Sequence, residues 1–160
     1  MFGTNVLPFL LTFERHWVVP RRRRLNFEGA IHHVFFRGNA RERIFLTDAD
    51  RNRFVRSLAD RVDTYQIRMF LYCLMPNHVH FLLETPLGNL PDFMESFLTS
   101  YAVYFNKRHD RVGHLTQGRY RSPLVGGDEY LLKLSRYIHL NPVSTARWRY
   151  RTVDERLARL

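Results

Sequence analysis

The segment Leu74-Met75-Pro76-Asn77-His78-Val79-His80-Phe81-Leu82-Leu83-Glu84 organises the interpretation of the whole chain. Its run of apolar and aromatic residues is typical of a buried β-strand. Side chains two residues apart on a strand point to the same face of a sheet, so His78 and His80 are expected to stand side by side. Two neighbouring imidazoles supply half of a metal site. Such a pair alone also fits ordinary hydrogen-bonded or surface histidines.

A second segment, residues 128–142, supplies the chemistry that the histidine pair lacks. Leu131, Leu134 and Ile138 recur at helical spacing. Asp128 is suited to the start of this helix and Pro142 to its end. Tyr137 and Asn141 are four residues apart and share one helix face. A phenol and an amide oxygen beside two imidazoles would place a nucleophile next to a metal ion.

Five segments of the chain together resemble a known family, the IS200-like single-tyrosine transposases of the HUH endonuclease superfamily. The resemblance is strongest to the REP-associated tyrosine transposases. It rests on Phe36-Arg37-Gly38-Asn39, residues 72–77, His78-Val79-His80, residues 113–120 and residues 137–143, in family order. The resemblance covers residues 20–147, preceded by an extension over residues 1–19 and followed by a short basic tail over residues 148–160.

This resemblance implies cleavage and strand transfer of single-stranded DNA with hairpin structure. Tyr137 would attack a phosphodiester and form a 5′-phosphotyrosine, leaving a free 3′-hydroxyl. His78, His80 and the Asn141 side-chain oxygen would hold a divalent cation, Mg²⁺ or Mn²⁺, that neutralises charge on the phosphate. Asn141 stands where many relatives carry glutamine, and its alternative role is simply a helix C-terminal position before Pro142.

Other tyrosines compete with Tyr137 for the role of nucleophile. Tyr130 lies seven residues earlier, on nearly the same helix face. Tyr101 and Tyr104 belong to an aromatic stripe for which core packing is expected. Tyr137 is favoured because it lies one helical turn from Asn141.

The charge of the chain favours a polyanionic partner. The formal net charge is +10, and all of the 25 basic residues except Lys107 and Lys133 are arginine, which pairs bidentately with phosphate. The residues expected to bind DNA are Arg21, Arg22, Arg23, Arg24, Arg37, Asn39, His114, Gln117, Arg119 and Arg121. A solvated tail or loop is the alternative for each of them.

The pattern of elements predicts an α+β fold, a ferredoxin-like split βαβ arrangement with an antiparallel sheet plus an added C-terminal helix that carries the tyrosine. Strands are expected over residues 30–37, 66–75, 78–84 and 119–125. Ile67, Met69, Leu71 and Cys73 are expected on one face of the second strand. Helices should follow a capping box at Thr47-Asp48-Ala49-Asp50 and an N-cap at Asn89. His32 and His33 point to opposite faces and are interpreted as structural or substrate-facing.

Composition excludes some classes of protein and leaves others open. Cys73 is the only cysteine, which excludes an intrachain disulfide and a Cys-rich zinc module and fits the cytoplasm. The apolar residues 5–13 are too few to span a membrane.

Two rival functions are a non-catalytic ferredoxin-like nucleic-acid-binding protein and a metal-dependent phosphohydrolase, which would need more carboxylates than Glu84 and Asp128. A homodimer, with Tyr137 supplied by a second copy, and the choice between mobile element and domesticated gene stay open.

Overall fold

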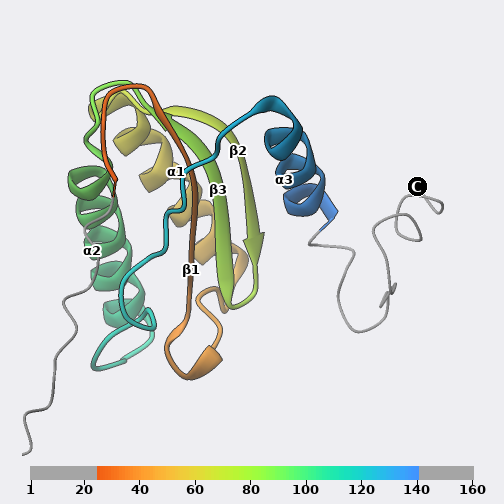
Figure 1. The fold of residues 1–160 in the computed structure, drawn as a ribbon. Coiled ribbons are helices and arrows are strands. Elements are labelled where there is room, and N and C mark those ends of the chain that lie inside the picture. The colour runs from red at the N-terminus through yellow and green to blue at the C-terminus, as the bar shows by residue number, and fades with distance from the viewer. Residues whose placement is uncertain (1–24, 141–160) are drawn as a thin grey trace, which may run out of the picture.

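The computed structural model describes residues 25–140, apart from the side chains of residues 128–130. The elements are β1 (Ala30–Arg37), the short 3-10 helix η1 (Asn39–Arg41), α1 (Asp48–Thr64), β2 (Arg68–Met75), β3 (His78–Thr85), α2 (Leu90–Arg108) and α3 (Asp128–Leu140), as Figure 1 shows. This order confirms the predicted α+β arrangement.

Three strands form an antiparallel sheet in the order β1-β3-β2. The strands β1 and β2 both run antiparallel to β3 and are therefore parallel to each other, as a crossover through α1 requires. The predicted tight connection at Pro76-Asn77 is confirmed, because Met75 pairs directly with His78 across it. The histidine strand β3 is thus central and has a neighbour on each side.

The predicted strand over residues 119–125 is wrong as a regular strand. The segment runs beside the outer edge of β1 and makes only isolated bridges, His32 with Leu124 and Phe35 with Arg121. Phe35 and Arg121 exchange backbone hydrogen bonds of 2.9 and 2.8 Å. Pro123 has no backbone N–H and cannot continue a regular ladder. Although it is not a regular strand, the segment determines which of its own side chains lie beside the edge of the sheet.

The prediction for the faces of β2 is also wrong in part. The register of β2 against β3 shifts between Met69 and Leu71. Ile67 and Met69 pack into the main core, whereas Leu71 and Cys73 pack on the opposite face. A bulge that adds one residue to a strand reverses the facing of the residues beyond it, which explains the change.

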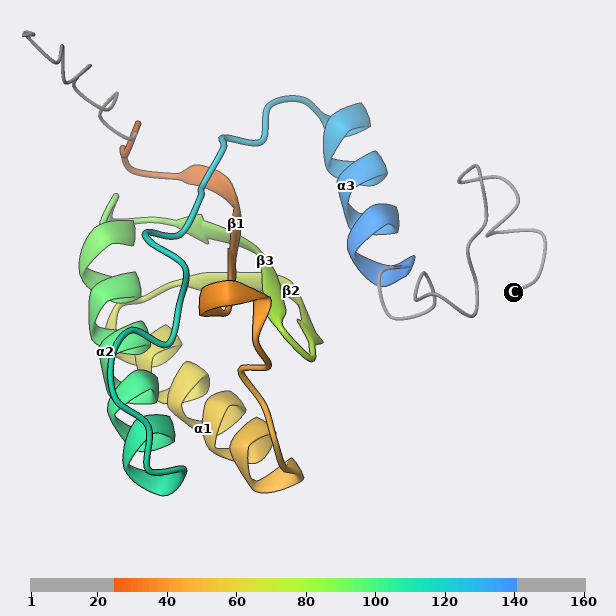
Figure 2. The same ribbon diagram turned by 90° about the horizontal axis from the view of Figure 1, so that it is seen from below.

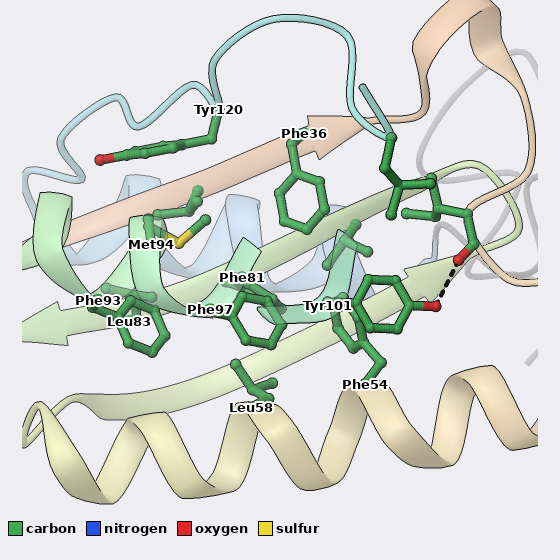
Figure 3. Close-up of a cluster of buried hydrophobic side chains, with 14 of the residues drawn as sticks. Phe36, Phe54, Leu58, Phe81, Leu83, Phe93, Met94, Phe97, Tyr101 and Tyr120 are labelled. Atoms are coloured by element: carbon green, nitrogen blue, oxygen red, sulfur yellow. Dashed lines mark hydrogen bonds between the residues drawn. The ribbon is translucent and has the colours of Figure 1, made fainter. Parts of the chain in front are cut away.

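The helices α1 and α2 cover one face of the sheet and enclose a core rich in aromatic residues (Figures 1 and 3). Val79, Phe81 and Leu83 point into this core from β3. The ring of Phe54 on α1 contacts Phe97 of α2 with 4.9 Å between centroids, at 76°. Edge-to-face contacts of this kind stabilise beyond the burial of area.

The N-terminus of α1 is linked to the C-terminal end of α2. Thr47 and Asp50 form the predicted capping box, and Asp50 is fully buried. Its carboxylate also lies 3.0 Å from Nε2 of His109. Asn89 is the N-cap residue of α2, as predicted, but its side chain makes no capping hydrogen bond and its amide donates instead to the Tyr65 carbonyl at 2.9 Å.

The helix α3 lies on the opposite face of the sheet from α1 and α2 (Figure 2). Leu134 and Ile138 pack there against Cys73, Met75 and Leu82 in a second, smaller cluster. Val79 and its neighbours fill the main core, so the alternate residues of β3 face this second layer. None of the helices within residues 25–140 combines the length and apolar character needed to cross a membrane.

Candidate active site

His78 and His80 project from the face of β3 that α3 partly covers. Their rings lie 5.2 Å apart between centroids and are nearly perpendicular, at 87°. His80 is 6% exposed, while His78 is half-buried. The expected juxtaposition of the two imidazoles is confirmed.

A hydrogen bond to Asn77 fixes the ring of His78. The Asn77 side-chain nitrogen donates to the Arg41 carbonyl at 3.1 Å, so the Asn77 side-chain oxygen faces His78. That oxygen can only accept, and it lies 2.8 Å from Nδ1 of His78. Nδ1 of His78 therefore carries a proton and donates. Its Nε2 is left with a lone pair in the neutral ring.

His80 is paired with a residue from the neighbouring strand. Nδ1 of His80 lies 3.0 Å from Nε2 of His33 on β1, and the two rings stack at 17° with 5.2 Å between centroids. His32, which points to the other face as expected, is fully buried. Sequence reasoning missed the contact because it depends on the pairing of β1 with β3, which places Phe35 opposite His80.

Burial keeps the imidazoles of this cluster in the neutral form. Burial lowers the pKa of His80 to about 4, and the neighbouring His33 and His78 rings add to the shift. Burial also lowers the pKa of His78, with a further contribution from Arg37, and burial alone lowers that of His33. Neutral imidazoles are the form that binds metal ions.

The predicted nucleophile, Tyr137, is brought to His80 within the same chain. Their ring centroids lie 5.8 Å apart, edge to face at 89°. Tyr137 is 45% exposed, so a substrate can reach its phenol. Tyr101 and Tyr104 lie on the other side of the sheet, on α2, and the Tyr101 hydroxyl donates to the Ile44 carbonyl at 2.7 Å (Figure 3).

Some of the predicted site lies outside the described residues. These positions are Asn141, Arg21, Arg22, Arg23 and Arg24, together with the side chain of Tyr130. Within residues 25–140, no group of three or more His, Cys, Asp or Glu side chains is arranged to hold a metal ion. Glu84, one of the two acids expected near the site, instead forms an ion pair of 3.0 Å with Arg68. Burial raises the pKa of the Cys73 thiol, which disfavours the thiolate form that binds metals.

Several of the predicted DNA-binding residues border the histidines. Arg37 pairs with His78 across the sheet, and its Nε donates to the side-chain oxygen of Gln117 at 2.6 Å. Arg121 lies opposite Phe35, so its side chain starts on the same face as His80. The remaining residues of this set, Asn39, His114 and Arg119, are exposed.

Comparison with solved structures defines the class of fold. A REP-associated tyrosine transposase bound to a REP hairpin is similar with a TM-score of 0.65 and 15% identity, over 84% of this chain and 78% of that chain. A candidate transposase from Deinococcus radiodurans R1 is similar with a TM-score of 0.52 and 17% identity, over 74% and 95% of the two chains. Comparison with curated proteins finds no significant match in sequence. The chain therefore shares its fold with a tyrosine transposase.

The family follows from the sequence itself. The model of the family described as "Transposase IS200 like" matches residues 26–141, most of the chain. The protein belongs to the IS200-like transposase family, which supports a role as a transposase acting on DNA. The match lies inside the domain predicted over residues 20–147, whose boundaries stay a prediction.

Proposed function

We propose that this protein cleaves single-stranded DNA beside hairpins and rejoins strands through a 5′-phosphotyrosine on Tyr137, with the help of Mg²⁺ or Mn²⁺. The observation that carries the proposal is the contact of the Tyr137 ring with His80, on the face where His78 also projects. A nucleophile and two metal-binding imidazoles from one chain are the parts that this reaction needs.

The donor atoms of the two histidines fit a divalent cation. His78 and His80 each use Nδ1 in a hydrogen bond within the protein, which leaves Nε2 of both rings for a ligand. Asn141 would add its side-chain oxygen. A bound cation would supply charge stabilisation for the phosphate in the transition state.

The tyrosine itself performs the covalent step. The Tyr137 hydroxyl oxygen attacks phosphorus in line with the departing 3′-oxygen, loses its proton to solvent and forms the new phosphodiester. The bond from phosphorus to the 3′-oxygen breaks, and the 3′-oxygen takes up a proton. Attack by a 3′-hydroxyl on the phosphotyrosine reverses the step and joins the strands. The number of phosphodiester bonds is unchanged, so the reaction requires no ATP.

The residues beside the histidines are suited to the DNA backbone. Arg37 is exposed next to His78 and is oriented by Gln117, and Arg121 borders the same face. Guanidinium groups pair with phosphate oxygens, and the net charge of +10 favours binding to a polyanion. The similar structure that holds a REP hairpin supports hairpin-bearing DNA as the substrate.

Trapping the covalent adduct tests the proposal directly. The full-length protein is incubated with labelled single strands that carry a hairpin, with Mn²⁺ or with a chelator, and run on a denaturing gel. The wild type should form an adduct that requires the metal ion, Tyr137→Phe should form none, and Tyr130→Phe should retain it. An adduct lost in Tyr130→Phe and kept in Tyr137→Phe would reassign the nucleophile.

The same gel separates the rival functions. DNA binding without any adduct would favour a non-catalytic binding protein, and cleavage without an adduct would favour a phosphohydrolase. Mixing Tyr137→Phe with His80→Ala asks whether a homodimer shares its sites. Because His80 and Tyr137 of one chain lie together, we expect the mixture to form no adduct.

A further inference from the structure

We propose that His33 is a positioning residue for the metal site, one that fixes the proton of His80 on Nδ1 and so keeps His80 Nε2 available as a ligand. This inference rests on the proposed function. It assigns a role to a buried histidine on β1 that lies outside the His-x-His motif.

The hydrogen bond between the two rings holds one proton, and either His33 or His80 can be its donor. Nε2 of His33 and Nδ1 of His80 are 3.0 Å apart, and both residues are buried, at 7% and 6% exposure. If His80 donates, its Nε2 is unprotonated and can bind a cation. If His33 donates, the neutral His80 ring carries its proton on Nε2 and cannot. Only the first arrangement is compatible with a metal site.

His78 is held in the same way, and the position of its proton follows directly from its partner. The Asn77 oxygen can only accept, so His78 carries its proton on Nδ1. His78 and His80 are thus each held through Nδ1 by a residue outside their strand. Within residues 25–140, Nε2 of neither ring has a hydrogen-bond partner. Both rings then present the same atom to a ligand.

A metal-bound histidine gains from such a partner in two ways. The acceptor fixes the tautomer and the orientation of the ring, and it makes the ligating nitrogen more basic. Loss of the partner typically lowers metal affinity by about 10- to 100-fold. Contact with Phe35, whose ring is tilted at 36° to that of His33 with 5.1 Å between centroids, restricts the ring of His33 further. The role of His33 is therefore to orient His80 and not to bind metal or DNA.

The experiment compares two substitutions at His33 with a control at its neighbour. His33→Phe keeps an aromatic ring in the stack but removes the acceptor, while His33→Gln restores an acceptor oxygen. Phe35→Leu changes the packing of His33 and His80 without touching their hydrogen bond. In each full-length protein, nitrogen-15 NMR of the metal-free form reports the His80 tautomer, and a Mn²⁺ titration reports affinity.

We expect His80 to carry its proton on Nδ1 in the wild type and in Phe35→Leu. In His33→Phe, His80 should shift toward the Nε2-protonated form, and Mn²⁺ binding should weaken about 10- to 100-fold. His33→Gln should regain part of the Mn²⁺ affinity. A wild-type His80 protonated on Nε2, or His33→Phe that binds Mn²⁺ as tightly as the wild type, would overturn the inference alone. A wild type that binds no Mn²⁺ and forms no covalent adduct would overturn the proposed function as well.

Discussion

Removing the side chain of Ile138 should release α3 from the sheet without unfolding the rest of the domain. Ile138 is 1% exposed and, with Leu134, anchors α3 to Cys73, Met75 and Leu82. Ile138→Ala removes three carbon atoms, at about 0.8 kcal/mol each, so docking is weakened by about 2.4 kcal/mol. That corresponds to a change of roughly 60-fold in the equilibrium between docked and undocked helix.

Hydrogen exchange measures this change where it occurs. The amides of α3 should exchange up to about 60-fold faster in Ile138→Ala, whereas those of α1 and α2, which pack on the other core, should change little. Leu132→Ala, which removes as many carbons from a side chain of the same helix that is 65% exposed, is the control and should exchange like the wild type.

Two outcomes would refute this account of how α3 is held. Equal acceleration in α1, α2 and α3 would mean that α3 opens only when the whole domain unfolds. Unchanged exchange in α3 would mean that the small cluster around Ile138 contributes little to its position. In either case Tyr137 would not be placed beside His80 by an independent docking step.

Three further predictions concern the core and the DNA. Asp50→Asn should destabilise the fold by about 3 kcal/mol, because it weakens the hydrogen bonds of a fully buried carboxylate. Burial alone raises the pKa of Asp50, but hydrogen bonds from His109 and from the Leu46 and Thr47 backbone outweigh it and lower the pKa. The difference in urea unfolding should therefore be full at pH 5 to 7 and shrink as the pH falls below about 4. Tyr101→Phe, which removes the hydrogen bond to Ile44, should cost about 1 kcal/mol in the same assay. Arg37→Ala should weaken binding to hairpin-bearing single strands and reduce the slope of log affinity against log salt by about 0.7. An unchanged slope would mean that Arg37 contacts no phosphate.

Local sequence signals predicted most elements of the fold. The capping box at Thr47 located the start of α1, and the strand bounds of β1 are as expected. The alternation along β3 correctly placed His78 and His80 on one face and Val79 on the other. These features depend on residues close in sequence, whose preferences are strong enough to decide the local structure.

The features that sequence reasoning missed depend on contacts between distant segments. The bulge in β2 appears only when Met69 and Leu71 are paired with β3, and the irregular segment beside β1 reflects Pro123. The contact of His33 with His80 likewise needs the register of β1 against β3. Without the register, the sequence gives no reason to choose His33 over His32 as the partner of His80.

The alternation of β3 also ties the chemistry of the protein to its stability. Phenylalanine and aliphatic side chains of this strand fill the main core from one side, and the imidazoles stand on the other. Shifting β3 by one residue relative to its neighbouring strands would exchange the two sets, burying imidazoles among aromatic side chains and moving Phe81 to the face that carried the histidines. The hydrophobic free energy that selects the strand register therefore also selects which atoms a substrate meets, and a chain that has folded correctly has already oriented its histidines.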